Sequence, residues 1–592
     1  MIKLDQIRAD KLVELACARF DSAPSEAELK VLRDSASSLN PDVPAADAPL
    51  LPIRAEFVRW LMTDLEAAPQ IDQRGLRAWG VTVRGPLDLQ GCCLNAHLSF
   101  VYSTFEQVVD LRYAQTRALL IMNSTLCAGL LADGVIVRGP AFFRQVQSTG
   151  QIRLLGAHID GDLSCTGAQL VGAECTLFAD RAHVNGGVYL NEGFASTGEI
   201  RLPGAEIGEV LDCSGAILGA EGRSLDGDRI KVEGGVYLNA GSKNPFVSAG
   251  EIRLLGAHLK SNLECDGAQL LAPGKALSLD GAKVEGAVFL RAGFECRGEI
   301  RMPGADISSD LVIFGASTRK VACKNLRVGG DLIWYGVKAL PGASLDLMGA
   351  KVKVLRDDRD SWPAEGTLSL NGFEYDDLVL HHPPKDEQLK NGLTTADELP
   401  LTVADRIEWL ERQAPDGRTA PQPWIELRDL LERSGDHAGA KHAMYTLSCL
   451  NAKESHAPVR AAKISFAWIE EAPLRIGWSM AAVFLLGWLV FGYAGARGAL
   501  APTDSGAYTA FTQGQPMPGA YPVLNPLAYT FDNAVPLFKL GQDDKWAPDR
   551  RFPSQSLLTN YWFLMWFRWF LTLSGWFQAT VFGAALFGLF QD

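Results

Sequence analysis

Cysteine recurs at one position of a repeated pattern in this sequence, at Cys165, Cys213 and Cys265. A regular column of thiols could bind a metal ion or carry electrons. Other copies of the pattern have leucine or isoleucine there, and a buried cysteine behaves as a small hydrophobic residue. We therefore interpret the column as core packing, and we expect no metal, cofactor or catalytic residue in this chain.

A second regular column is basic, and it is the candidate solenoid surface column. It could form an anion-binding groove, but a glutamate precedes three of the four arginines by two residues. Stacked opposite charges on the outer face of a sheet explain such a pattern equally well. The four arginines are Arg153, Arg201, Arg253 and Arg301.

Histidines occupy a third column, at His158 and His258, where other copies of the pattern have Glu206, Lys283 or Asp306. A position that accepts both signs of charge is typical of a solvated outer surface. We interpret these histidines as surface residues and not as metal ligands.

Charged residues near the carboxyl terminus form the last candidate set. Asp532, Asp543 and Asp544 lie between two apolar segments, and Arg568 borders the second segment. Ionisable groups beside membrane spans are often functional. Arg568 could gate a pore, bind a lipid headgroup or extend its charge to the interface. We keep these four residues as candidates for function in a membrane module.

The elements that position these columns are short strands. The segment "GEIRLLGAHLKSNLECDGAQL" from Gly250 has relatives that begin at Gly150, Gly198 and Gly298. Apolar residues alternate with period two, which indicates strands, and the pattern recurs every 21 to 27 residues. Such a period predicts a solenoid. We expect a mainly β protein, a β-solenoid of about thirteen coils, starting at Leu87, Val109, Leu130, Ile152, Leu177, Ile200, Leu225, Ile252, Leu277, Ile300, Val321, Leu345 and Leu368.

Four regions follow from this pattern. Residues 1–75 predict a helical cap, with a capping box at Ser25 and Glu28 and an apolar stripe through Ile53, Phe57, Trp60, Leu61 and Leu65. Residues 76–380 are the solenoid. Residues 381–465 are a helical linker, and residues 466–592 are a membrane domain. The helices predicted in the linker resemble one tetratricopeptide hairpin.

Two apolar runs predict transmembrane helices, at residues 476–496 and 569–590. The first run has 21 residues without a charge, and about 31 Å of helix crosses the hydrocarbon layer. Tryptophans concentrate around these runs, as at membrane interfaces. The amino terminus has no secretory signal pattern, so we expect a cytoplasmic solenoid and a multi-pass protein of the bacterial inner membrane.

Composition narrows the range of partners. The net charge is −13 and the isoelectric point is near 5.3, so we expect no nucleic acid, which requires a basic surface. The partners we expect are membrane lipid and a protein bound to the solenoid surface, and a homo-oligomer is a further possibility. No CxxCH motif, no cysteine cluster of the kind that binds an iron–sulfur centre and no strand-linked GxGxxG motif supports a redox cofactor.

The order of coils, helical hairpin and two spans around "AYTFDNAVPLFKLGQDDKWAP" resembles a group of bacterial pentapeptide-repeat-like membrane proteins. Many of these carry the label "membrane-associated oxidoreductase". The resemblance implies a solenoid and a membrane location, and it supplies no catalytic residues. We expect a non-enzymatic membrane-anchored scaffold or sensor. The alternatives are an oligomeric channel or signalling effector gated by the solenoid, and the oxidoreductase that the label implies.

Overall fold

The structure is a computed structural model that describes residues 2–44, 48–172, 174–381, 398–399, 402–413, 420–453, 455–461, 463–464, 475–535, 538–553 and 556–586. The chain divides into two compact units, Met1–Glu426 and Leu427–Asp592.

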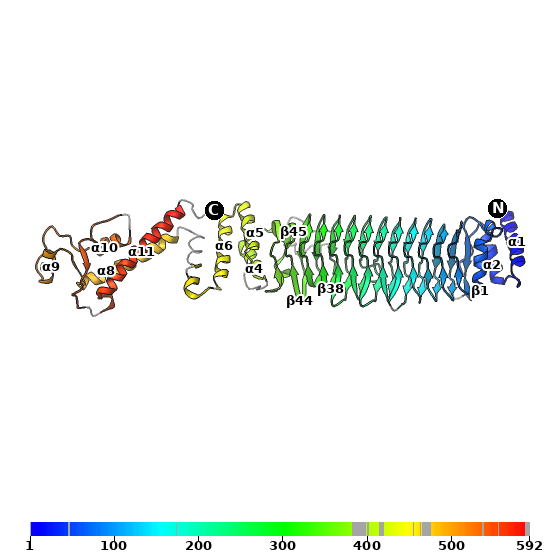
Figure 1. The fold of residues 1–592 in the computed structure, drawn as a ribbon, viewed down its shortest axis with the longest axis horizontal. Helices are drawn as coiled ribbons and strands as arrows, with labels where there is room; N and C mark the ends of the chain where they lie inside the picture. The colour runs from blue at the N-terminus through cyan, green and yellow to red at the C-terminus, as the bar shows by residue number, and fades with distance from the viewer. Residues whose placement is uncertain are drawn as a thin grey trace. The chain divides into compact units, whose positions relative to one another are not determined.

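The first unit contains a parallel β-solenoid, as predicted (Figure 1). A typical coil has four short strands, for example β30 (Val247–Ser248), β31 (Glu251–Arg253), β32 (His258–Leu259) and β33 (Leu263–Glu264). Each strand pairs in parallel with the equivalent strands of the coils before and after it. The thirteen predicted starting residues, from Leu87 to Leu368, pair one after another in a single column. The predicted β-solenoid of about thirteen coils is confirmed.

Alternation along each strand builds the core. Ile252, Leu254, Leu259 and Leu263 in this coil all point inward and are fully buried, because successive residues of a strand face opposite sides. Gly256 has a φ of +60° at the corner between two strands, a conformation in which a β-carbon would be strained. The repeated Gly-Ala dipeptide therefore marks a corner of the coil.

Helices precede the first coil. They are α1 (Ile2–Arg19), α2 (Glu26–Ala36) and α3 (Ala55–Thr63), and the capping box of Ser25 and Glu28 at the start of α2 is confirmed. The predicted helical stripe was too long. Ile53 belongs to strand β1 (Leu51–Arg54), which pairs with β3 (Val81–Arg84) of the solenoid, and Leu65 lies beyond the end of α3 with 93% of its surface exposed.

Two helices follow the last coils. Helix α4 (Val403–Glu411) carries Arg406, which forms a buried ion pair with Asp357 at the end of β45 (Lys351–Asp357). Helix α5 (Gln422–Arg433) begins with Gln422, whose side chain accepts a hydrogen bond from the Gly372 amide and donates one to the Phe373 carbonyl. These contacts satisfy backbone groups that the last coil would leave unpaired.

The second unit contains the remainder of α5 and five further described helices: α6 (His437–Ala452), α8 (Arg475–Ala496), α9 (Ser505–Thr512), α10 (Pro526–Ala534) and α11 (Tyr561–Leu586). The segment between α8 and α11 includes a short antiparallel pair, β49 (Leu500–Pro502) with β50 (Trp546–Pro548). Helices α8 and α11 lie side by side, with α10 packed against both (Figure 1).

Within the described residues, one helix is long and apolar enough to cross a membrane. It is Gly477–Ala496, which matches the first predicted span. Helix α11 covers most of the second predicted span, 569–590, but residues 587–590 lie outside the described residues.

Candidate functional site

The candidate arginine column forms a ladder of ion pairs on the outside of the solenoid. Each arginine pairs with an aspartate of the preceding coil at 2.6–2.8 Å. The glutamates that precede the arginines in sequence are farther away, at 3.9 Å for Glu199 and 3.6 Å for Glu299. The pairs are Arg153–Asp133, Arg201–Asp180, Arg253–Asp228 and Arg301–Asp280.

Ion pairing stabilises the charged form of three of these arginines. The hydrogen bonds that Arg201, Arg253 and Arg301 donate to their paired aspartates raise the pKa of these three guanidinium groups. Because each guanidinium already meets a carboxylate, the column offers little positive potential to an external anion. Its contribution is to join adjacent coils on the outer face.

The cysteine column lies inside the solenoid. Cys165, Cys213 and Cys265 are fully buried, and burial raises the pKa of Cys165 to about 12. The strand register places Leu190 between the first two cysteines and Leu238 between the last two. The cysteines are therefore two coils apart, about 9.6 Å at the usual strand spacing, which is too far for a disulfide or a shared metal.

The histidine column lies on the outer surface. His158 and His183 are stacked with their ring centroids 4.9 Å apart, and His258 lies 2.9 Å from Glu285. Among the described residues, no group of three or more histidine, cysteine, aspartate or glutamate side chains is arranged to hold a metal ion.

Three of the four candidate residues in the second unit lie close together around α10. The Asp532 carboxylate, which is 7% exposed, accepts hydrogen bonds from the backbone amides of Leu540, Gln542 and Asp543. One acidic side chain thus folds the loop that follows α10 back onto the helix. Three backbone donors hold the carboxylate in place.

Arg568 connects this loop and α10 to α11. Its Nε donates to the Asn533 side-chain oxygen at 2.7 Å, and its Nη2 donates to the Asp543 carbonyl at 3.2 Å. The Asp543 carboxylate lies 3.9 Å from Arg568 and 3.1 Å from Lys539. The Asp544 carbonyl accepts a hydrogen bond from the Thr503 hydroxyl. We call Asp532, Asn533, Asp543 and Arg568 the polar cluster.

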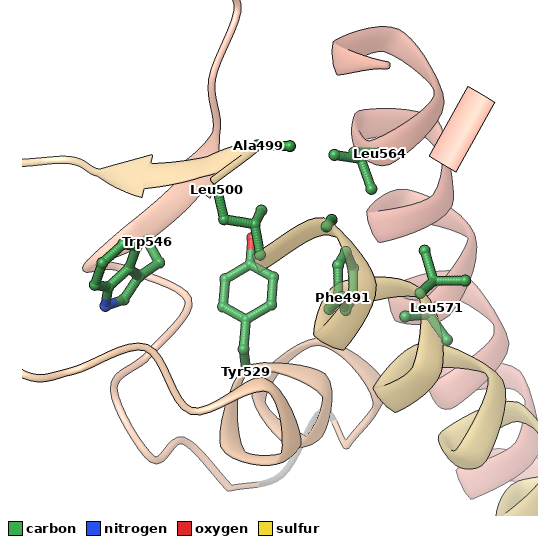
Figure 2. Close-up of a cluster of buried hydrophobic side chains, with 9 residues drawn as sticks. Phe491, Ala499, Leu500, Tyr529, Trp546, Leu564 and Leu571 are labelled. Atoms are coloured by element: carbon green, nitrogen blue, oxygen red, sulfur yellow. The ribbon is translucent and has the colours of Figure 1, made fainter. Parts of the chain in front are cut away.

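A layer of apolar side chains packs beside the polar cluster. Figure 2 shows Phe491 of α8 between Tyr529 of α10 and Leu571 of α11. The Phe491 and Tyr529 rings meet edge to face, with centroids 4.8 Å apart. The guanidinium of Arg568 lies 5.9 Å from the Tyr529 ring centroid. Charged groups and aromatic rings together join three helices.

The sequence prediction missed Asn533 and Tyr529. Both lie in the stretch "AYTFDNAVP", and their spacing of four residues along a helix predicts a shared face. It also missed the repeated segments "GGVYLN" at residues 186–191 and 234–239, which contain Tyr189 and Tyr237.

Comparison of the chain with protein-family models, with curated proteins and with solved structures finds no match.

Proposed function

We propose that this protein is a membrane-anchored β-solenoid scaffold of the bacterial inner membrane. In this proposal α8 and α11 cross the bilayer, and the solenoid presents an extended surface to a protein partner in the cytoplasm. The observation that carries the proposal is the reversed polarity of the second unit, where charged groups lie among the helices and large apolar side chains face outward.

Helix α8 has the properties of a span. It contains 22 residues, or about 33 Å of helix, enough for the hydrocarbon layer. Only 22% of its most apolar stretch is buried within the chain. The core helix of a soluble protein would be mostly buried. Trp478, Leu485 and Leu489 are more than half exposed.

Helix α11 exposes an apolar face of its own. The helix has 26 residues, and its exposed large side chains recur at intervals of three or four residues, as on one helical face. Tryptophan and phenylalanine in such numbers suit contact with lipid and its interface. The exposed residues are Trp562, Trp566, Trp569, Phe570, Leu573, Trp576 and Phe577.

Short helix α10 supports the proposal by its position. Thr530 packs against Gly487, near the middle of α8, and a side chain at Gly575 of α11 would collide with the Ala534 carbonyl. Small residues allow this close approach, as they do between membrane helices. Helix α10 thus enters from the segment between the spans and places the polar cluster where protein, and not lipid, surrounds it.

Alkaline extraction of membranes tests the proposal. The full chain, expressed in bacteria, is expected to remain in the membrane pellet. Replacing Leu486 and Leu489 on the exposed face of α8 with arginine should release it, because each charge costs about 2.5–3.5 kcal/mol at mid-membrane. The matched control replaces Val171 and Ile217, exposed apolar residues of the solenoid, with arginine and should stay in the pellet. Full extraction of the wild-type chain would contradict the anchor.

A channel or signalling effector is the second candidate, and the polar cluster, which includes Arg568 of α11, favours it. Two spans are too few to enclose a water-filled path, so a pore would require several copies of the chain. Vesicles that contain the full chain distinguish the candidates. A scaffold gives no conductance above the control, whereas a pore gives currents that change when Arg568 is replaced by glutamine.

A further inference from the structure

Aromatic residues form a regular column on the outer face of the solenoid. Phe142, Tyr189, Tyr237 and Phe289 occupy equivalent positions on β13 (Ala141–Phe142), β21 (Val188–Tyr189), β29 (Val236–Tyr237) and β37 (Val288–Leu290). They recur at every second coil, and the register places Ser164, Asp212 and Glu264 in the coils between them. Aromatic and hydrophilic side chains therefore alternate along one line.

The two outer rings of this column already hold a cation. The guanidinium of Arg144 lies 4.1 Å from the centroid of the Phe142 ring, and that of Arg291 lies 4.1 Å from the centroid of the Phe289 ring. Each arginine follows its ring by two residues. Such stacking is a favourable cation–π contact. Rings in this column can therefore bind a guanidinium.

The two central rings differ at the same relative position. Asn191 follows Tyr189 by two residues and Asn239 follows Tyr237 by two. Within the described part of the chain, no arginine or lysine lies over either tyrosine ring. Both rings are partly exposed. The two central rings are thus placed like the outer rings, but among the described residues no arginine is stacked on them.

Glycine fixes the orientation of these tyrosines. A β-carbon at Gly187 would lie 2.8 Å from Cζ and Oη of Tyr189, and one at Gly235 would lie 3.0 Å from the same atoms of Tyr237. The tip of each ring therefore lies against the glycine two residues earlier, where a β-carbon would leave too little room. The rest of each side chain stays partly exposed.

Acidic side chains surround the tyrosines. Asn191 donates to Asp212 at 2.6 Å, and Asn239 donates to Glu264 at 3.4 Å, which orients both carboxylates beside the rings. Burial, and then the nearby carboxylates Asp162, Glu209 and Asp212, raise the pKa of Tyr189. The local field is negative and favours a positively charged ligand.

We infer that Tyr189, Asp212, Tyr237 and Glu264 form a docking strip for an extended basic segment of a protein partner. Two cationic side chains of that segment stack on the two tyrosines, and the carboxylates accept their hydrogen bonds. The inference rests on the proposed scaffold function and specifies the chemistry of the partner.

The geometry also specifies the spacing of the ligand. Two coils separate Tyr189 from Tyr237, which is about 9.6 Å at the usual strand spacing. Three residues of a polyproline-type extended chain cover about 9.3 Å. The recognised pattern is therefore two basic residues three positions apart, most strongly two arginines, because a guanidinium stacks well on a ring.

Fluorescence anisotropy with the purified full chain in detergent tests the strip. The probe is a labelled twelve-residue peptide of glycine, serine and proline that carries two arginines three positions apart. It should bind, and the matched peptide with citrulline in place of both arginines should bind at least tenfold more weakly. Replacing Tyr189 and Tyr237 with leucine should weaken binding by a similar factor. The control Phe142→Leu, at a ring that already holds Arg144, should leave binding unchanged.

A second pair of variants introduces arginines in the chain itself that should occupy the two tyrosine rings. Asn191→Arg and Asn239→Arg place a guanidinium where Arg144 and Arg291 lie in the outer rings, so together they should block the peptide while the melting temperature stays the same. Equal binding of the citrulline peptide, no effect of the tyrosine changes, or binding of a chitin hexasaccharide in place of the peptide would overturn the inference. Membrane extraction is measured on the same variants. The result distinguishes failure of the proposed membrane anchor from failure of the proposed docking strip.

Discussion

The Nε of Arg568 donates a hydrogen bond of 2.7 Å to the side-chain oxygen of Asn533, which joins α11 to α10. The Asn533 amide nitrogen donates in turn to the Tyr529 carbonyl at 2.7 Å within α10. Both ends of the asparagine are thus used, and its orientation is fixed. A rigid contact of this kind links the segment between the proposed spans to the second of them.

Replacing Arg568 with leucine should destabilise the second unit by about 1.5–3 kcal/mol, the usual contribution of a hydrogen bond to a charged group. The loss should depend on Asn533, so Asn533→Ala should cost much less in the leucine variant than in the wild type. Detergent-induced unfolding, followed by tryptophan fluorescence, measures these energies. The control Trp569→Leu lies on the exposed face and should change little, and additive energies for Arg568 and Asn533 would contradict the contact.

The buried cysteines predict a pH dependence of stability. Burial raises the pKa of Cys165 to about 12 and also raises the pKa of Cys213 and Cys265, whereas an unfolded thiol titrates near 8.5. The folded state therefore retains protons that the unfolded state loses, so this contribution is complete below about pH 8.5 and disappears as the pH rises toward 12. Unfolding measured between pH 8 and pH 11 should show the loss.

Replacing all three cysteines with valine should preserve the fold and make the alkaline loss of stability shallower. Thiol labelling of the native wild type should modify the exposed cysteines Cys17, Cys93 and Cys127 and spare the buried column. Stoichiometric metal or flavin in the purified protein, lost in the triple variant, would show that the column has a redox role instead.

Topology gives a further prediction. A reporter that is active only outside the cytoplasmic membrane should be silent when inserted after Arg460 and active after Gly514. Gly514 is a suitable site because it has a φ of +68° in a turn with open space around it. The reverse pattern would place the solenoid outside the cytoplasm and would contradict the proposed location of its partner.

The coil architecture could be predicted because its signals are local. Alternation recurs in every coil and Gly-Ala corners recur in several, so each starting residue from Leu87 to Leu368 could be assigned from its own neighbours. Ile53 was misplaced for the opposite reason. Its strand forms only because β3 offers an unpaired edge about 30 residues later, and no local pattern distinguishes that strand from the helix that follows.

Side-chain contacts between coils could not be predicted from the sequence either. The sequence showed a glutamate two residues before Arg253, but the paired Asp228 lies 25 residues earlier, and coil lengths vary enough to hide that spacing. Asp532 shows the same limit within the second unit. Its carboxylate accepts hydrogen bonds from backbone amides of a loop. Because nearly every residue type has a backbone amide, the sequence does not reveal such a contact.

The pair of Arg406 and Asp357 allows the end of the solenoid to be tested. Nη1 of Arg406 donates to Oδ2 of Asp357 at 2.8 Å and Nη2 donates to Oδ1 at 2.7 Å, and neither side chain is more than 2% exposed. Trp362 donates to the same carboxylate at 2.7 Å. An ion pair without solvent depends on both partners, because the remaining charge cannot be hydrated.

Arg406→Met should therefore destabilise α4 and β45 by about 3–5 kcal/mol. Hydrogen exchange of the full chain should locate the loss in these two elements and leave the middle coils protected, because each coil of a solenoid contacts mainly its neighbours. The combined variant Arg406→Met with Asp357→Asn should recover part of the stability, since it removes the unpaired charge. The control Glu408→Gln breaks the exposed pair with Arg412 and should cost less than about 1 kcal/mol. If Arg406→Met and Glu408→Gln had equal effects, the buried pair would not be what holds α4 on the last coil.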